Sequence, residues 1–164
     1  MTNTFLIGKK TVLRPITPKD AELLTQWNND PETRKYLGRR FPLSELDEKA
    51  WIEKVSILSK HPSDIVLIVE SLDTKEAVGI MGLHGIEWIH RNAVTGTMIG
   101  TGHRGKGLAT DAKMLLLGYA FETLGMHKIT SRAFSKNIKS IEYSKRCGYQ
   151  VEAILREEVF LAGA

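Results

Sequence analysis

The sequence IGTGHRGKGLAT at residues 99–110 places four glycines and two cations directly before an amphipathic segment. Backbone this rich in glycine can bring several N–H groups close to one object, and a helix N-terminus behind it favours a negative charge there. This stretch therefore predicts a loop that cradles a phosphate or a pyrophosphate. It also predicts that a strand passes into a helix at this point of the chain.

The composition is that of one ordinary globular domain. The chain has 164 residues, of which 42% are hydrophobic and 26% are charged, so we expect residues 1–164 to form a single domain with one core. No apolar run approaches the ~20 residues of a membrane helix, and the N-terminus lacks the pattern of a signal peptide. We therefore expect a cytoplasmic protein without membrane contact.

Cysteine content and charge exclude further classes of protein. Cys147 is the single cysteine, so an internal disulfide and a metal site built on cysteine pairs are excluded, and we expect no metal. The formal net charge is +4, without a long run of like charge or an aromatic and basic strand pattern. These features disfavour nucleic acid as a partner. They leave a phosphorylated cofactor or a solvated surface as the reason for the positive charge.

The part of the chain before the glycine run predicts helices first and an antiparallel sheet after them. Thr17 and Ser44 stand where helix N-caps are expected, and Asp47 completes a capping box with Ser44. Three β-branched or apolar stretches separated by turn residues then indicate a hairpin meander. The expected elements are a strand at 11–16, helices at 18–28 and 44–58 with a short helical turn to residue 37 between them, and strands at 64–70, 77–83 and 93–99.

The part after the glycine run predicts alternating helices and strands. Apolar residues from Leu108 to Leu124 keep a helical period, and Gly125 and Gly148 stand where helices end. This order predicts a mixed α/β fold with a central, largely antiparallel sheet flanked by helices. The expected elements are a helix at 108–124, a strand at 127–134, a helix at 138–146, a strand at 149–154 and the start of an incomplete last strand at 158–161.

Three phosphate-binding motifs share the glycines of the run. The first is G-x-G-x-x-G, but a dinucleotide fingerprint belongs in a first βαβ unit, and this run lies two-thirds along the chain. The second is G-x-x-x-x-G-K-S/T, which fails because Gly107 replaces the hydroxyl residue that would hold Mg²⁺. The third, Q/R-x-x-G-x-G/A, is matched in full from Arg104 to Ala109.

Through the third motif the chain resembles the GNAT superfamily of N-acetyltransferases, in which this loop holds the pyrophosphate of acetyl-CoA. Asn137-Ile138-Lys139-Ser140 and Arg146-Cys147-Gly148-Tyr149 resemble the family's N-x-x-S and K/R-x-G-F/Y segments, and Leu13-Arg14-Pro15 resembles its opening. The branch that the chain most resembles is the Rim-like one, which includes the ribosomal-protein alanine N-acetyltransferases. The resemblance implies a GNAT fold with a splay in the sheet beside the CoA-binding loop, and acetyl-CoA as the co-substrate.

The resemblance also implies which residues hold acetyl-CoA. The pantetheine arm would lie along the strand that ends at Ile99, and an N–H group near this residue would polarise the thioester carbonyl. Asn137 would contact the arm from the other side, although it also suits a helix N-cap, and Lys106 also suits a plain surface position. The cofactor-binding residues implied are Met98, Ile99, Arg104, Gly105, Lys106, Gly107, Leu108, Ala109, Thr110, Asn137, Ser140 and Arg146.

This sequence lacks the family's usual general base and general acid at their expected positions. The branch often carries a glutamate in the strand at residues 93–96, and this sequence has none there. The family's tyrosine acid is replaced by a serine, with a tyrosine one residue earlier. The catalytic candidates are Glu87 as the preferred general base, Tyr143 and Ser144 on the acid side, and His84 and His90 as alternative bases.

The sequence says less about the amine that accepts the acetyl group than about acetyl-CoA. Residues 34–41 form a cationic segment ahead of the sheet, which favours a peptide or protein N-terminal amine over a polyamine. The amine would attack acetyl-CoA directly within a ternary complex. Two alternatives stay open: acetylation of a small-molecule amine such as a polyamine, an amino acid or an antibiotic, and a non-catalytic acyl-CoA-binding domain of the same fold. A homodimer is compatible with the branch.

Overall fold

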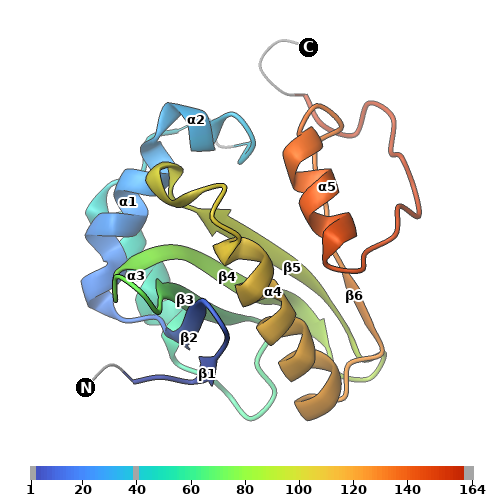
Figure 1. Ribbon diagram of the computed structural model, residues 1–164, viewed down its shortest axis with the longest axis horizontal. Helices are drawn as coiled ribbons and strands as arrows, with labels where there is room; N and C mark the ends of the chain where they lie inside the picture. The colour runs from blue at the N-terminus through green and yellow to red at the C-terminus, as the bar shows by residue number, and fades with distance from the viewer. Residues whose placement is uncertain (1–2, 39–40, 161–164) are drawn as a thin grey trace.

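The computed structural model describes residues 3–38 and 41–160 and shows one curved sheet with helices on both faces (Figure 1). The six strands follow one another across the sheet in chain order. They are β1 (Leu6–Ile7), β2 (Thr11–Pro15), β3 (Ile65–Ser71), β4 (Ala77–Glu87), β5 (Asn92–Ile99) and β6 (Lys128–Thr130). The helical elements are η1 (Pro18–Asp20), α1 (Ala21–Asn29), α2 (Pro31–Arg34), α3 (Glu45–Ser56), η2 (Thr101–His103), α4 (Leu108–Gly118), η3 (Tyr119–Thr123) and α5 (Ile138–Arg146). None of these described helices is long and apolar enough to cross a membrane.

The mixed α/β fold class is confirmed, and the sheet is antiparallel except at one edge. β1 to β5 pair antiparallel, as the meander predicted, and β5 pairs parallel with β6. A parallel pair needs a crossover, because a tight turn cannot bring a strand back in the same direction. The connection that contains α4 is this crossover, and the glycine run is where it begins.

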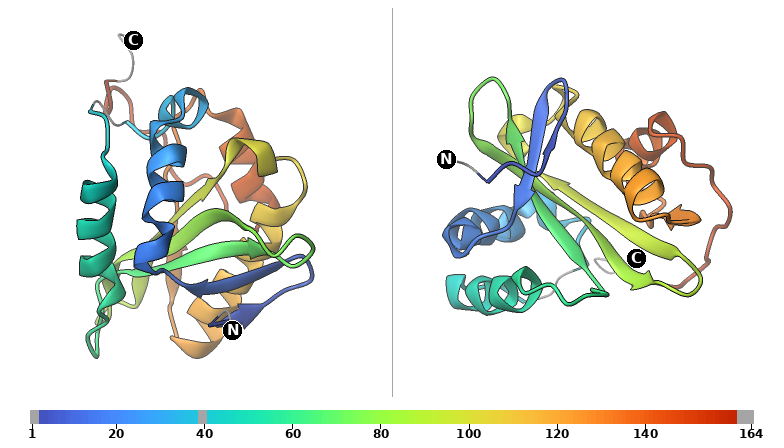
Figure 2. Two further views of the ribbon diagram at one scale, coloured as in Figure 1. Left: turned by 90° about the vertical axis from the view of Figure 1, so that its left-hand side faces the viewer. Right: turned by 90° about the horizontal axis from the view of Figure 1, so that it is seen from below.

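Each face of the sheet has its own apolar core. α1 and α3 cover one face, and α4 covers the other (Figure 2). Because both faces are covered, all seven residues of β3 are buried. The first core includes Leu24, Trp27, Ile52, Val66 and Ile68, and the second includes Leu13, Leu67, Met81, Leu83, Leu108, Ala112 and Leu116.

The helix starts follow the predicted caps. Ser44 Oγ accepts a hydrogen bond from the Asp47 N–H at 3.1 Å, and the Asp47 carboxylate accepts one from the Ser44 N–H at 2.9 Å, so this capping box is confirmed. Thr17 precedes the short 3₁₀ turn η1 rather than α1 itself. The Asp20 carboxylate in that turn accepts hydrogen bonds from the Thr17 N–H and from the Arg14 guanidinium, which fastens β2 to the start of α1.

The end of α4 departs from a regular helix. In the π-helical turn η3, the Leu124 N–H donates to the Tyr119 carbonyl at 3.0 Å. Gly125 then adopts a left-handed conformation with φ +66° and ends the helical segment, as its position predicted. The continuous helix expected at 108–124 is thus an α-helix followed by one wider turn.

Two strand predictions after α4 fail. β6 ends at Thr130, because residues 131–134 find no pairing with β5. The strand expected at 149–154 is not formed, and its aliphatic residues Val151 and Ile154 are exposed. An alternating sequence cannot supply the neighbouring strand that its backbone groups need, and no described strand lies beside it. Of the last strand expected at 158–161, the first three residues are irregular and Leu161 lies outside the described residues.

Candidate active site

The sheet opens beside the glycine run. β5 and β6 pair only over residues 92–94 and 128–130, and β5 then continues to Ile99 without a described strand beside it on that side. The two strands diverge between α4 and α5 (Figure 1). The predicted splay is therefore confirmed, and it leaves part of the main chain of β5 free to pair with something else.

The main-chain groups that face this splay follow from the pairing of β5 with β4. The Gly100 N–H donates to the Val78 carbonyl at 2.9 Å, and hydrogen bonding alternates along an antiparallel ladder. Met98 therefore bonds toward β4, whereas the N–H and C=O groups of Thr97 and Ile99 point into the splay. An extended ligand can pair with the main chain of Thr97 and with the Ile99 N–H as an added strand would.

The loop after β5 is built on two glycines in the left-handed region. Gly105 and Gly107 both have φ +79°, a conformation that costs a residue with a Cβ about 1–2 kcal/mol. α4 begins directly after the second glycine, and the Asp111 N–H donates to the Gly107 carbonyl at 3.1 Å. The N–H groups of residues 108–110 in the first turn have no acceptor within the helix. Loop and helix start together offer several main-chain donors to an anion.

Arg104 joins this loop to β5 and to α2. Its Nε donates to the Ile99 carbonyl at 2.9 Å, and its Nη2 donates to Thr33 Oγ1 at 2.6 Å. Thr33 donates in turn to the Asp30 carboxylate, which also accepts a hydrogen bond from Thr101 at 2.7 Å. Hydrogen bonds from Thr101 and Thr33 lower the pKa of Asp30 and keep it ionised. The Arg104 side chain, which the resemblance placed among the cofactor-binding residues, thus holds α2 against the end of β5.

Tyr143 reaches the splay from α5. Its hydroxyl donates to the Ala109 carbonyl at 3.2 Å and lies 3.4 Å from Thr97 Oγ1. Burial raises the pKa of Tyr143, so its hydroxyl stays protonated at neutral pH. The side chain therefore brings a proton donor next to the strand whose main chain is free.

The remaining predicted site residues have simpler positions. Asn137 caps α5 by accepting a hydrogen bond from the Ser140 N–H at 3.2 Å, which is the structural alternative that its sequence allowed. Ser144 is half-buried and Arg146 is exposed. The Met98 side chain packs with the α1 and α3 core, on the other face of the sheet from Tyr143.

A histidine–aspartate pair lies on that other face. The imidazole of His84, on β4, lies over two glycines: a Cβ placed on Gly82 or on Gly96 would come within 3.0 or 3.1 Å of His84 Nε2. His84 Nδ1 is 3.0 Å from the Asp64 carboxylate. Burial acts to raise the pKa of Asp64, but hydrogen bonds from Ser63 and His84 outweigh it and lower this pKa. An ionised Asp64 favours the tautomer with hydrogen on Nδ1 and leaves Nε2 as a free acceptor.

The family follows from comparison with known proteins. A family model described as an acetyltransferase (GNAT) domain matches residues 10–150. The chain belongs to the GNAT acetyltransferase family. It is therefore an N-acetyltransferase, with acetyl-CoA as its co-substrate. Across residues 3–38 and 41–160, no group of three or more His, Cys, Asp or Glu side chains is arranged to hold a metal ion.

Individual relatives cover most of this GNAT chain. Spermidine N(1)-acetyltransferase from Escherichia coli (strain K12) is 29% identical over 154 residues, which cover 92% of this chain and 78% of the relative. Putative ribosomal N-acetyltransferase YdaF from Bacillus subtilis (strain 168) is 27% identical and covers 98% of this chain and 88% of its own length. A solved structure of spermidine N-acetyltransferase from Vibrio cholerae, in complex with CoA and spermine, matches with a TM-score of 0.84 at 27% identity, over 93% of this chain and 88% of that one.

Strand register places Glu87 far from the splay of this GNAT domain. Glu87 is opposite Asn92, at the other end of the eight-residue strand β5 from Ile99. At the rise of a strand this separation is roughly 20 Å. His90 is exposed in the same hairpin turn. The geometry does not support Glu87 as the general base, and of the three candidates in this segment His84 lies nearest to the splay.

A buried lysine behind the splay was missed by the sequence analysis. Lys113 on α4 is 2% exposed, and its Nζ is 5.9 Å from the ring centre of Tyr143 and 5.8 Å from that of Tyr149. Burial lowers the pKa of Lys113 to about 8. Its helical spacing from Leu116 and Leu117 is the signal that could have found it, because this spacing places Lys113 on the apolar face of α4.

Proposed function

We propose that the protein transfers the acetyl group of acetyl-CoA to a primary amine by direct attack within a ternary complex. The observation that carries this proposal is the splay, whose free main chain leads straight into the two-glycine loop. A strand-like pantetheine arm fits beside Thr97 and Ile99. The loop follows Ile99 directly, so it can bind the pyrophosphate to which the arm is attached. The amine then approaches from the face that holds His84.

In this proposal, acetyl-CoA is held mainly by main-chain N–H groups. N–H groups from Gly105 to Thr110 face the pyrophosphate, and the Ile99 N–H faces the thioester carbonyl. A single donor of this kind typically changes a rate by ~10²–10³-fold, because it stabilises the negative oxygen of the tetrahedral intermediate. Arg104 acts by positioning, since its guanidinium holds the Ile99 carbonyl and α2.

His84 is the proposed general base in place of the missing strand glutamate. Its side chain is 41% exposed, so an ammonium acceptor or a water molecule can reach the imidazole. The base removes a proton from the ammonium, and the free amine nitrogen then bonds to the acetyl carbon. Asp64 orients the imidazole and stabilises the imidazolium that results.

Tyr143 is the proposed proton donor to the leaving thiolate. As the carbon–sulfur bond breaks, the electron pair goes to sulfur, and CoA leaves as the thiol after taking a proton. The Tyr143 hydroxyl lies beside Thr97 and carries its proton at neutral pH, although burial raises its pKa and makes it a weaker acid than a free tyrosine. Its contribution is modest, because a thiol with a pKa of ~8.5 is an easy leaving group.

A polyamine is the acceptor that the relatives favour. The Escherichia coli and Vibrio cholerae relatives are named for spermidine, and the Vibrio cholerae structure holds spermine. In this chain Lys35 is paired with Glu32, which reduces the positive charge of the segment at residues 34–41. The carboxylate of Asp64 adds negative charge on the acceptor face. Arg39 and Arg40, which belong to the same segment, lie outside the described residues.

A peptide or protein N-terminal amine, as in the Rim-like branch, is the second candidate. The similarity to YdaF, a putative ribosomal N-acetyltransferase, supports it. The kcat/KM for spermidine should exceed that for a peptide with an N-terminal alanine by at least tenfold if the polyamine assignment holds. The opposite order would move the acceptor to the peptide class and leave the acetyl-CoA site unchanged.

We predict that His84→Gln lowers kcat strongly, whereas Glu87→Gln leaves it close to the wild-type value. Removing a positioned general base typically costs ~10²–10⁴-fold in rate. The glutamine keeps a polar side chain of similar reach but cannot take the proton. The kcat of each variant, measured with saturating acetyl-CoA at one fixed pH, tests this prediction. A kcat that is unchanged in His84→Gln and falls in Glu87→Gln would restore Glu87 as the base.

A further inference from the structure

The junction between α1 and α2 lies directly against the end of β5, beside the glycine loop (Figure 1). A Cβ placed on Gly100 would come within 2.6 Å of Trp27 Nε1, so the indole packs on the main chain of Gly100. One residue further, the Thr101 hydroxyl donates to the Asp30 carboxylate at 2.7 Å. Segments 71 residues apart in the sequence are therefore joined at the point where β5 passes into the loop before α4.

One hydroxyl group, that of Thr33, links the carboxylate of Asp30 to the guanidinium of Arg104. Asp30 Oδ2 accepts hydrogen bonds from the Thr33 N–H at 2.9 Å and from Thr33 Oγ1 at 2.8 Å. Because the hydroxyl gives its single hydrogen to Asp30, its oxygen is left to accept from Arg104 Nη2, at 2.6 Å. The seven ion pairs found within residues 3–38 and 41–160 include neither charged group, so the two are joined through Thr33 rather than directly. Arg104, Thr33 and Asp30 thus form a chain, the Thr33 relay.

The Thr33 relay ends on the peptide group between Ile99 and Gly100. Arg104 Nε donates to the Ile99 carbonyl at 2.9 Å, and the Gly100 N–H of the same peptide group donates to the Val78 carbonyl at 2.9 Å. This peptide group is held from both sides, whereas without Arg104 only its N–H would be held. Since Arg104 occupies the carbonyl, the Ile99 N–H is the last main-chain group of β5 with which an extended ligand in the splay can pair.

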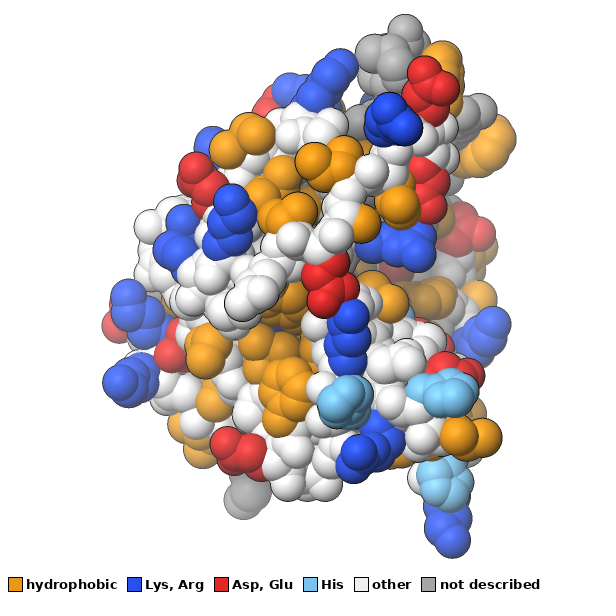
Figure 3. Space-filling model, turned by 90° about the vertical axis from the view of Figure 1, so that its right-hand side faces the viewer, with side chains coloured by type: hydrophobic (Ala, Val, Ile, Leu, Met, Phe, Trp, Pro, Cys, Tyr) orange, Lys and Arg blue, Asp and Glu red, His pale blue; other side chains and the backbone are white. Residues whose placement is uncertain are grey.

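The α5 side of the splay supports β5 at a different residue. Tyr143 reaches the strand from α5, and its hydroxyl lies 3.4 Å from Thr97 Oγ1, two residues before Ile99. On the face of the molecule that carries α5, hydrophobic side chains gather near the middle (Figure 3), and the Tyr143 ring packs against the core under α4. The Ile99 carbonyl is therefore held from the α2 side, through Arg104.

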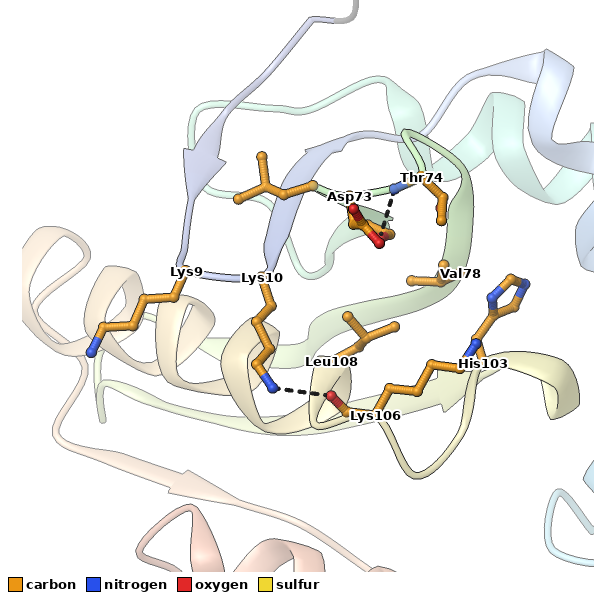
Figure 4. A pocket seen from close by; sticks show the side chains of 10 residues that line it. Lys9, Lys10, Asp73, Thr74, Val78, His103, Lys106 and Leu108 are labelled. Carbon is orange, nitrogen blue, oxygen red and sulfur yellow. Dashed lines mark hydrogen bonds between the residues drawn. The ribbon is translucent and has the colours of Figure 1, made fainter.

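The glycine loop has a separate attachment to the rest of the molecule. Lys10 Nζ donates to the Lys106 carbonyl at 3.2 Å (Figure 4). The Asp111 carboxylate, in the first turn of α4, accepts hydrogen bonds from the Lys10 and Thr11 N–H groups at 3.0 and 2.9 Å. The β1–β2 turn thus holds the loop and the start of α4 without the help of α2. A break in the Thr33 relay should therefore disturb the end of β5 and leave the phosphate-binding loop in place.

We propose that Thr33 and Asp30 are positioning residues for acetyl transfer, which act on the reaction through Arg104. They hold the guanidinium on the Ile99 carbonyl and so fix the main-chain N–H groups that meet the thioester. This role rests on the proposed function, because it takes the end of β5 as the place where the acetyl group is bound. An oxyanion donor is worth ~10²–10³-fold in rate only where it points at the developing charge, so a rotation of this main chain costs part of that factor.

The test compares Thr33→Val with Thr33→Ser. Valine has nearly the shape of threonine and keeps the N–H that caps α2, but it lacks the hydroxyl, so it breaks the relay without removing the cap. Serine keeps both groups. With saturating acetyl-CoA and spermidine, we expect kcat to fall about tenfold or more in Thr33→Val and to stay near the wild-type value in Thr33→Ser. The dissociation constant of CoA, measured by calorimetry, should stay within about threefold of the wild-type value in both variants.

Two further measurements separate positioning from a general structural effect. Arg104→Lys keeps the charge, but a lysine lacks the fork that bonds Ile99 and Thr33 together, so Thr33→Val should add little to its loss of kcat in the double variant. In NMR spectra, the amide protons of Thr97 and Ile99 should differ in chemical shift between the CoA and acetyl-CoA complexes of the wild type. This difference should shrink in Thr33→Val and persist in Thr33→Ser.

The outcomes distinguish failure of this proposal from failure of the proposed function. A wild-type kcat in Thr33→Val, equal losses in Thr33→Val and Thr33→Ser, or additive losses in the double variant would overturn the proposal. A loss of CoA affinity with an unchanged kcat would overturn it as well. Failure of the proposed function shows differently, as a wild type that binds acetyl-CoA without transferring its acetyl group, and the amide shifts then decide on the relay by themselves.

Discussion

Gly107→Glu should weaken acetyl-CoA binding by roughly 100-fold or more, which is about 2.7 kcal/mol, while the protein stays folded. Gly107 has φ +79°, and a Cβ added there would lie 3.2 Å from Lys10 Nζ. The glutamate would place a negative charge where the pyrophosphate is proposed to sit, and its strain would turn the neighbouring N–H groups. Both effects weaken binding of the pyrophosphate, so the dissociation constant of acetyl-CoA measured by calorimetry should rise.

The matched control for this variant is Gly125→Glu. Gly125 also has a positive φ, +66°, and an added Cβ meets nothing within 4 Å. This residue follows η3, at the far end of the α4 segment from the loop. The control therefore imposes a similar backbone strain and the same charge, yet it should bind acetyl-CoA as the wild type does. Equal affinities in the two variants would show that the loop is not the phosphate site.

Lys113→Met should raise the free energy of unfolding at pH 7 by about 1–3 kcal/mol. The lysine is 2% exposed, and burial lowers its pKa from 10.5 to about 8, so charging it at pH 7 opposes folding. The two aromatic rings of Tyr143 and Tyr149 recover part of that cost through cation–π contacts. Methionine has a similar length and carries no charge, so it fills the same space without the penalty.

The pH dependence of this gain separates a charge effect from a packing effect. Between pH 8 and pH 10.5 the unfolded chain binds more protons at Lys113 than the folded protein does, so the wild type gains stability as the pH rises. The advantage of Lys113→Met should therefore shrink over this interval. Urea unfolding at pH 7 and pH 10 measures it, with Lys145→Met, an exposed lysine on α5, as the control. An advantage that does not change with pH would mean that folding does not lower the pKa of Lys113 and that the gain comes from packing.

The sequence correctly predicted those elements whose formation depends on residues close to one another in the chain. The capping box of Ser44 and Asp47 and the helix Ile138–Arg146 were found because caps and helical period act within a few residues. The strand expected at 149–154 failed because a strand depends on a neighbour that its own residues do not specify. The length of β6 was overestimated for the same reason, because its pairing with β5 ends at Thr130.

The candidate site also contains residues that local sequence reveals and residues that only the tertiary structure brings together. The loop from Arg104 to Ala109 is continuous in sequence, so its motif could be found there, and its left-handed glycines accord with that motif. His84 lies on β4 and Asp64 directly precedes β3, and only the register of β3 on β4 brings them within 3.0 Å. Glu87 was preferred over His84 because a bulge near the end of β4 and the direction of each side chain are not visible in the sequence.

The most direct test of acetyl transfer measures thiol release together with the acetylated product. Wild-type protein is mixed with saturating acetyl-CoA and spermidine, free CoA thiol is followed by its colour reagent, and the amine is examined by mass spectrometry. Thiol and N-acetylated amine should form in equal amounts, and neither should form at a comparable rate without the amine. If acetyl-CoA raises the melting temperature of the protein but no thiol is released with spermidine or with peptide amines, the chain binds the co-substrate without transferring its acetyl group, and the proposed function is wrong.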